Sequence, residues 1–143
     1  MIVLDTTMLH YAVVEEHELR EDARRLVAAV EAGRIQATTT VEVVQEFAHI
    51  YAKRRSRAQA VRIARQYSEM LAPLLSTDRG HLDAGLRLYE RHAGLGAFDA
   101  VLAAVAMAQD APLISADSDF KAVAGLRHVA PGTPAFEELL AQG

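Results

Sequence analysis

The chain of 143 residues has no cysteine, no tryptophan and only two lysines. Without cysteine it can form neither a disulfide bond nor a thiolate metal site. No apolar run reaches the roughly 20 residues that a membrane-spanning helix needs. The first residues also lack the basic and long apolar segments of a secretory signal. We therefore expect a cytoplasmic protein with no membrane segment.

Apolar residues are abundant by contrast, at 51% of the chain, which is enough to build a sizeable core. The length is within the usual range of one compact domain. No internal repeat, low-complexity segment or linker interrupts the sequence. We therefore expect residues 1–143 to form a single domain.

Basic residues are concentrated in one stretch. The net charge is −4, but residues 47–68 contain six basic residues and no acidic one, so the rest of the chain carries −10. The densest part holds Lys53, Arg54, Arg55 and Arg57. Such a run either contacts phosphate groups, which arginine binds well, or is an ordinary solvated corner between two helices.

Short apolar runs rich in β-branched residues alternate with longer stretches of helical period. The runs predict strands at 1–5, 35–38, 113–115 and 127–130, with an edge strand or a turn at 74–76. The longer stretches predict helices at 19–32, from 39 or 40 to 51, 56–71, from 77 or 78 to 92, 97–109, and after Thr133. This alternation predicts an α/β fold with a short, mainly parallel sheet flanked by helices.

Four acidic residues stand at positions where acids are unusual. Asp5 and Asp117 follow apolar strands, Asp99 lies in the first turn of an apolar helix, and Glu46 lies inside a helix beside its apolar face. Each has an ordinary structural explanation: a turn or cap for Asp5 and Asp117, a helix N-terminal acid for Asp99, and a solvated residue for Glu46. In a parallel sheet, however, ligands bind outside the carboxyl ends of the strands.

If the four carboxylates converge, they cannot all stay ionised without a countercharge. No lysine or arginine is adjacent to any of them in the sequence. A hard divalent cation is the simplest countercharge, and oxygen ligands suit Mg²⁺ or Mn²⁺. Such an ion activates water and stabilises the transition state of phosphoryl transfer.

The segments MIVLDTT, TTTVEVVQEF, GLGAFDAVLAAVAMA, PLISADSDF and GLRHVAPG follow one another along nearly the whole chain. In this order they resemble the PIN-domain family, and within it the VapC-type toxin ribonucleases of bacterial toxin–antitoxin pairs. The resemblance implies a PIN-like three-layer fold. It also implies a catalytic metal-binding quartet and three supporting residues. The quartet is Asp5, Glu46, Asp99 and Asp117, and the supporting residues are Thr6, Ser115 and Asp119. Thr7 departs from the pattern, because relatives often have asparagine or serine there.

The implied activity is Mg²⁺-dependent hydrolysis of phosphodiester bonds, with Mn²⁺ as a substitute, in a specific transfer or ribosomal RNA. The resemblance further implies a homodimer and a VapB-type antitoxin that occupies the groove. Lys53, Arg54, Arg55 and Arg57 are then candidates for contact with the RNA backbone. The alternative is a non-catalytic PIN-like module that binds RNA or protein.

Two other classes open with a similar aspartate. A haloacid dehalogenase-type phosphatase needs a second aspartate two residues later, where this chain has Thr7, and a receiver domain needs a lysine at a later strand end. Neither Lys53 nor Lys121 ends a clear strand. The six histidines form no metal-binding pattern, and His49 is either a neighbour of Glu46 in the site or an exposed residue.

Overall fold

Four short parallel strands form the centre of the molecule. The computed structural model describes residues 1–143 and contains β1 (Ile2–Leu4), β2 (Ala37–Thr38), β3 (Leu113–Ile114) and β4 (His128–Val129). The strand order is β2-β1-β3-β4, and every neighbouring pair is parallel. The register pairs Leu4 with Ile114, so the residues that follow β1 and β3 emerge side by side.

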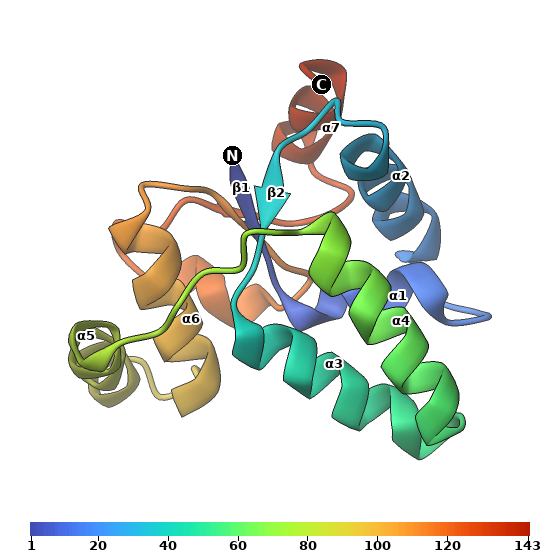
Figure 1. Ribbon diagram of the computed structural model, residues 1–143. Coiled ribbons are helices and arrows are strands. Elements are labelled where there is room, and N and C mark those ends of the chain that lie inside the picture. The colour runs from blue at the N-terminus through green and yellow to red at the C-terminus, as the bar shows by residue number, and fades with distance from the viewer.

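Helices surround this sheet. They are α1 (Thr6–Val13), α2 (Arg20–Glu31), α3 (Val41–Arg54), α4 (Arg57–Met70), α5 (Arg79–Arg91), α6 (Ala97–Ala108) and α7 (Pro134–Ala141), with a 3₁₀ helix at Ser118–Ala122. Figure 1 shows α5 and α6 on one side of the strands and α1, α2 and α4 on the other. The predicted three-layer α/β fold with a parallel sheet is therefore confirmed. None of the helices is both long and apolar enough to span a membrane.

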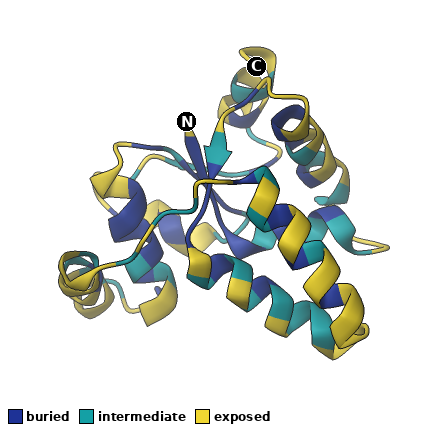
Figure 2. Ribbon diagram, in the orientation of Figure 1, coloured by how far each residue is buried: buried dark blue, intermediate teal, exposed yellow.

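One continuous core connects these elements. It contains 27 buried apolar residues that extend from Ile2 to Phe136. All three residues of β1 are buried, and in Figure 2 the strands lie at the buried centre while the outer faces of α4 and α5 are exposed. Residues on both sides of the sheet thus contribute to the same core, because a parallel sheet is covered on both faces.

Several helix ends lie where the sequence predicts them. Ser56 and Gln59 form a capping box at the start of α4. Asp78 caps α5, and Thr133 caps α7 with proline at the first helical position. These local signals are reliable because each cap is satisfied by hydrogen bonds within a few residues.

One helix was not predicted. Residues 6–13 form α1, which begins directly after Asp5, whereas the sequence pattern predicts no element there and a first strand that extends to residue 5. Two threonines open α1, and β-branched residues have a low helix propensity. The hydroxyl groups of Thr6 and Thr7 bond to acidic side chains of the site described below, so tertiary contacts stabilise this first turn.

Candidate metal centre and active site

Asp5 is at the centre of the site because the sheet delivers it there. The backbone N–H of Asp5 donates to the Ile114 carbonyl at 3.0 Å, which extends the pairing of β1 with β3 by one residue. The preceding residue, Leu4, is fixed from the β2 side, where the buried Thr39 hydroxyl donates to its carbonyl at 2.6 Å. Asp5 itself is only 3% exposed.

Two hydroxyl groups hold the Asp5 carboxylate. Ser115 Oγ donates to Asp5 Oδ2 at 2.6 Å, and Thr7 Oγ1 donates to the same oxygen at 2.9 Å. Each hydroxyl also accepts a backbone N–H of the loop after β3: Ser115 from Asp117 at 3.0 Å, and Thr7 from Ala116 at 3.1 Å. No protein group donates to the other oxygen, Oδ1, so it is available to a ligand. Asp5 occupies the N-cap position of α1, as the cap explanation predicts, but its side chain makes no cap hydrogen bond.

Glu46 faces the site from α3. Its Oε2 accepts a hydrogen bond from the Thr6 hydroxyl, and the residue is half-buried, so the solvated explanation of Glu46 is wrong. Helix α3 starts at Thr40, whose hydroxyl accepts the N–H of Val43. This start, directly after β2, orients Glu46 toward the end of β1.

Asp99 and Asp117 approach from the other side. Asp99 lies in the first turn of α6, whose middle is buried in the core. Asp117 begins the 3₁₀ helix, where its Oδ1 accepts the N–H of Asp119 at 2.9 Å, so it acts as a local cap as well as facing the site. Asp119 itself is exposed.

The four carboxylates share one open cavity of about 200 Å³. Its lining residues are Asp5, Thr6, Thr7, His10, Tyr11, Glu46, Ile50, Asp99 and Asp117. The structure therefore brings together all four acids of the predicted quartet. Ser115 lies behind Asp5, and Asp119 lies outside this cavity.

The acids of the cavity act on one another electrostatically. Burial, and then the negative charges of Asp5, Asp117, Glu46 and Asp119, raise the pKa of Asp99 to about 7. Without a cation, Asp99 therefore keeps a proton up to near-neutral pH. Perturbed acids of this kind are typical of functional sites.

The donors around the cavity suit a hard divalent cation. They are carboxylate and hydroxyl oxygens together with the imidazole of His10, without sulfur, and the charges that raise the pKa of Asp99 are the charges that a cation offsets. In the present side-chain positions, no three acidic or histidine side chains are close enough together to form a ready-made metal site. A bound ion would need small side-chain movements of these carboxylates.

Four residues of this cavity were not predicted from the sequence: Thr7, His10, Tyr11 and Ile50. Thr7 was treated as a departure from the family pattern, yet its hydroxyl connects Asp5 to the loop after β3. His10 lies one helical turn after Thr6 on α1 and is only 8% exposed. The spacing of four residues would have placed it on the same face as Thr6, had α1 been recognised. His49 is exposed and does not line the cavity.

The basic residues lie in the last turn of α3, the helix that carries Glu46, and in the connection to the start of α4. Lys53, Arg54, Arg55 and Arg57 are all exposed, at the corner between α3 and α4. Arg54 and Arg55 line a second cavity of about 250 Å³, and Arg55 pairs with Glu15. Lys53 and Arg57 line neither cavity.

Comparison with known proteins identifies the family. A model of the PIN domain family matches residues 2–126, which include every acid of the site. The chain is 45% identical to Ribonuclease VapC7 of Mycobacterium tuberculosis, with 98% of each chain covered. It is 33% identical to Ribonuclease VapC13 of the same organism, with 91% of this chain and 100% of that protein covered.

Solved structures with the same fold support this assignment. VapBC2 from Rickettsia felis, bound to a DNA fragment from its promoter, contains a chain that matches with a TM-score of 0.70 at 18% identity, over 91% of this chain and 98% of the other. A toxin–antitoxin complex from Klebsiella pneumoniae matches with a TM-score of 0.63 at 20% identity, over 88% and 95%. At these identities the likeness shows the fold. The family match and the near-full-length relatives show that the chain belongs to the PIN-domain family and, within it, to the VapC ribonucleases.

Proposed function

We propose that this chain is a toxin endoribonuclease that hydrolyses phosphodiester bonds of a specific transfer or ribosomal RNA with a divalent metal ion, and that an antitoxin neutralises it. The convergence of four acids on one cavity carries the proposal, and the raised pKa of Asp99 is its clearest sign. The names of the relatives, Ribonuclease VapC7 and Ribonuclease VapC13, support the same activity. Mg²⁺ is the proposed ion, and Mn²⁺ its substitute.

Each residue of the site has a proposed role. Asp5 and Asp99 bind the main ion directly, and Glu46 and Asp117 bind through water or hold a second ion. When bound, a divalent ion supplies charge for the scissile phosphate and lowers the pKa of water. One of the four carboxylates orients the attacking water.

The hydroxyl groups of the site position these acids. Ser115 and Thr7 occupy Asp5 Oδ2 and so direct Oδ1 toward the cavity, while Thr6 holds Glu46. Residues that orient metal ligands in this way affect metal affinity strongly, although they do not touch the ion.

Cleavage of total bacterial RNA tests the proposal. The purified protein is incubated with Mg²⁺, with Mn²⁺ and with EDTA, beside Asp99→Asn and the control Asp83→Asn, which changes an exposed aspartate of α5. We expect discrete fragments that require metal, persist with the control and disappear with Asp99→Asn. A folded wild-type protein that cuts no RNA under any condition would instead favour the non-catalytic module.

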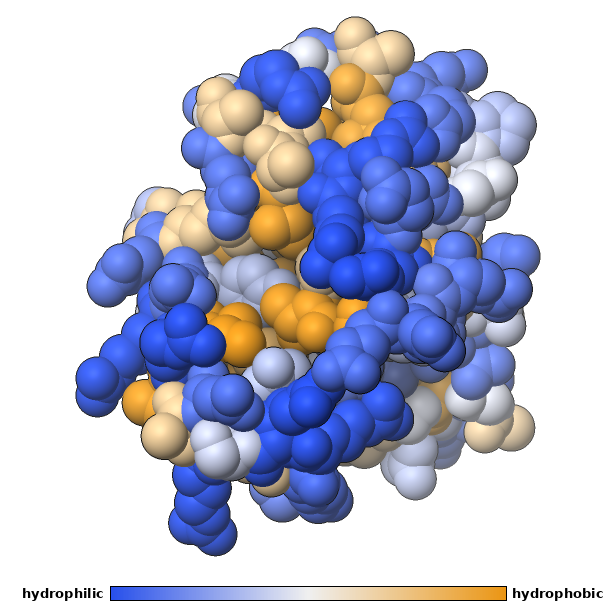
Figure 3. Space-filling model, turned by 90° about the vertical axis from the view of Figure 1, so that its right-hand side faces the viewer, coloured by the Kyte–Doolittle hydropathy of each residue, from blue (hydrophilic) through white to orange (hydrophobic).

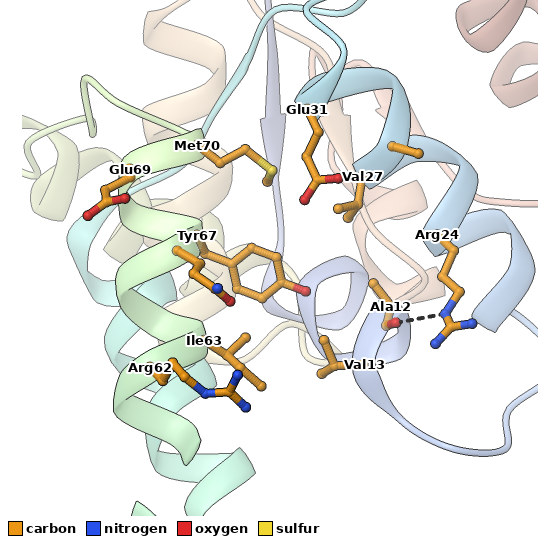
Figure 4. A pocket seen from close by; sticks show the side chains of 12 residues that line it. Ala12, Val13, Arg24, Val27, Glu31, Arg62, Ile63, Tyr67, Glu69 and Met70 are labelled. Carbon is orange, nitrogen blue, oxygen red and sulfur yellow. Dashed lines mark hydrogen bonds between the residues drawn. The ribbon is translucent and has the colours of Figure 1, made fainter. Parts of the chain in front are cut away.

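This chain has a candidate docking groove for the proposed antitoxin, separate from the carboxylate cavity. A cavity of about 850 Å³ lies between α1, α2 and α4. Figure 4 shows Val13, Val27, Ile63 and Met70 directed into it from these three helices, and Figure 3 shows apolar atoms in a hollow among hydrophilic side chains on this face. Charged residues of both signs line it as well: Arg24, Glu31, Arg62 and Glu69.

An apolar floor with charged edges suits an amphipathic segment of a partner protein. The groove does not include any acid of the metal site, so occupation of the groove and RNA cleavage are separable by mutation. We expect Ile63→Arg to keep RNA cleavage and to lose inhibition by the antitoxin.

The proposed homodimer has a candidate face on α5. Leu82, Leu86 and Tyr89 form a stripe on this helix, and each is about half exposed. Val41 and Phe98 are exposed nearby, and Leu82, Leu86 and Phe98 line one shallow apolar cavity. In a two-fold dimer the same patch of both copies meets. Light scattering is expected to give a dimer for the wild type and a monomer for Leu86→Glu.

A further inference from the structure

The carboxylate cavity and the second cavity adjoin at His10, and residues of α1 and α3 line both of them. His10 lines both cavities, with Arg54 and Arg55 in the second one. The Thr6–Glu46 hydrogen bond joins the two helices at the carboxylate end. From there Glu46, Ile50 and Arg54 follow one another at intervals of four residues on one face of α3, and the eight residues from Glu46 to Arg54 span about 12 Å.

His10 presents a hydrogen-bond donor to these two cavities. Its Nδ1 atom is completely buried and has no partner. A buried N–H without an acceptor is rarer than a buried acceptor without a donor, so the proton belongs on Nε2. Nε2 makes no hydrogen bond with the protein and is not among the buried atoms, so it reaches the cavity. Burial and the Arg54 charge lower the pKa of His10, which keeps the ring neutral at pH 7.

Arg54 is the unpaired cation of the second cavity. Two carboxylates line the cavity from the loop after α1, Glu15 and Glu16. Glu15 forms an ion pair with Arg55 and so occupies that guanidinium, whereas Arg54 has no ion-pair partner. His10 and Arg54 line the same cavity, so the two side chains are near each other.

We propose that His10 and Arg54 form a binding subsite for a phosphate group of the RNA strand, next to the position of the scissile phosphate. A strand that lies at the carboxylates must carry its neighbouring phosphates away from them, because the acids repel phosphate. The two cavities along α1 and α3 offer a neutral N–H donor and then a free guanidinium, both of which bind phosphate oxygens. The subsite rests on the proposed function for its ligand, and it selects Arg54 from the four basic candidates.

Binding of a short fluorescein-labelled oligouridylate tests the subsite without a known target. Anisotropy is measured at several salt concentrations with Ca²⁺ present, and a gel confirms that the strand stays intact. The variants are Arg54→Gln, His10→Phe and His10→Gln, which keeps an N–H donor. The matched control is Arg87→Gln, which removes an exposed arginine of α5 that lines neither cavity. Circular dichroism confirms that each variant is folded.

We expect Arg54→Gln to weaken binding roughly three- to tenfold and to reduce the slope of log K against log salt by about 0.7, the value for one phosphate contact with a single strand. His10→Phe should also weaken binding but change the slope less, because the imidazole that it replaces is neutral. His10→Gln should keep part of the affinity that His10→Phe loses. Glu15→Gln, which releases Arg55, should strengthen binding.

Three results of the binding assay would overturn the subsite. They are no binding of the oligouridylate by the wild type at low salt, an Arg54→Gln variant with the same affinity as Arg87→Gln, and a His10→Phe variant with unchanged affinity. In RNA cleavage, Arg54→Gln should raise KM and leave kcat unchanged. A wild-type protein that cuts no RNA would refute the proposed function, whereas cleavage with an unchanged KM in Arg54→Gln would refute the subsite alone.

Discussion

Replacing Asp99 by asparagine should stabilise the metal-free protein while it destroys the site. Burial, and then neighbouring charges, raise the pKa of Asp99 from 3.8 to about 7 in the folded chain. Between pH 4 and pH 7 the unfolded chain therefore releases this proton and the folded chain keeps it. Stability falls as the pH rises through this window, and the loss is complete above pH 7. Asparagine carries no such charge, so the variant avoids the loss.

The size of the effect follows from the same pKa. Each pKa unit corresponds to about 1.4 kcal/mol, which gives an upper limit of about 4 kcal/mol at pH 8. Because the Asp99 side chain is only partly buried, solvent screens the interaction, and we expect about 1–2 kcal/mol. At pH 4 the difference between the two proteins should be close to zero.

Urea unfolding with EDTA at pH 4 and pH 8 measures this difference. Far-UV circular dichroism is the suitable signal because the chain has no tryptophan. With an m-value of about 2 kcal/mol/M, the midpoint for Asp99→Asn should rise by about 0.5–1 M at pH 8. Asp83→Asn is the matched control and should not shift the midpoint. An Asp99→Asn variant that is less stable than the wild type at pH 8, or equally stabilised at both pH values, would refute the reasoning.

Three further predictions concern the ligands and their support. Ser115→Ala removes a hydrogen bond to Asp5, so the protein should lose about 1–3 kcal/mol of stability in urea unfolding. Its Mn²⁺ affinity, measured by calorimetry, should fall about 10–100-fold. Full Mn²⁺ affinity would exclude a positioning role for this hydroxyl. Mn²⁺ must displace the proton of Asp99, so the Mn²⁺ affinity should fall by up to tenfold per pH unit below about pH 7 and level off above it. A Mn²⁺ affinity that is independent of pH would contradict the assignment of Asp99 as a ligand. Gly85→Ala places a methyl group 2.7 Å from the Val101 backbone, so the packing of α5 against α6 should weaken. The free energy of unfolding, measured in urea, should fall by about 1–3 kcal/mol. Unchanged stability would show that the two helices separate freely.

The sheet and most helices were predictable from the sequence because their signals are local. Apolar runs mark the strands, and caps such as Ser56 and Asp78 mark the helix starts. Helix α1 was not predictable in this way, because the side chains that stabilise its first turn bond to residues far away in the sequence, at Glu46 and Ser115. That residues 1–143 act as a single domain stays a prediction.

Some local patterns are misleading for a similar reason. The spacing of Thr39 and Glu42 is that of a capping box, but Thr40 caps the helix and Glu42 accepts a hydrogen bond from the Thr77 hydroxyl. Tyr89 has the helical spacing typical of a core residue, yet it is half exposed on α5. Spacing alone cannot show whether an apolar face meets the core or remains on the surface.

The four acids were predictable as a set because three of them end strands or begin a buried helix. Their hydroxyl partners were only partly predictable. Thr6 and Ser115 followed from the family resemblance, whereas the role of Thr7, and the presence of His10 in the cavity, required the spatial arrangement of α1 beside β3 and α3. The assignment of the acids as metal ligands stays a prediction.

A Mn²⁺ soak of crystals, analysed by anomalous scattering, tests the metal site most directly. We expect a strong peak in the carboxylate cavity, within direct coordination distance of oxygens of Asp5 and Asp99, and the loss of this peak in Asp99→Asn. A protein that cuts RNA only with Mn²⁺ but holds the ion at a place away from these carboxylates would contradict the central claim.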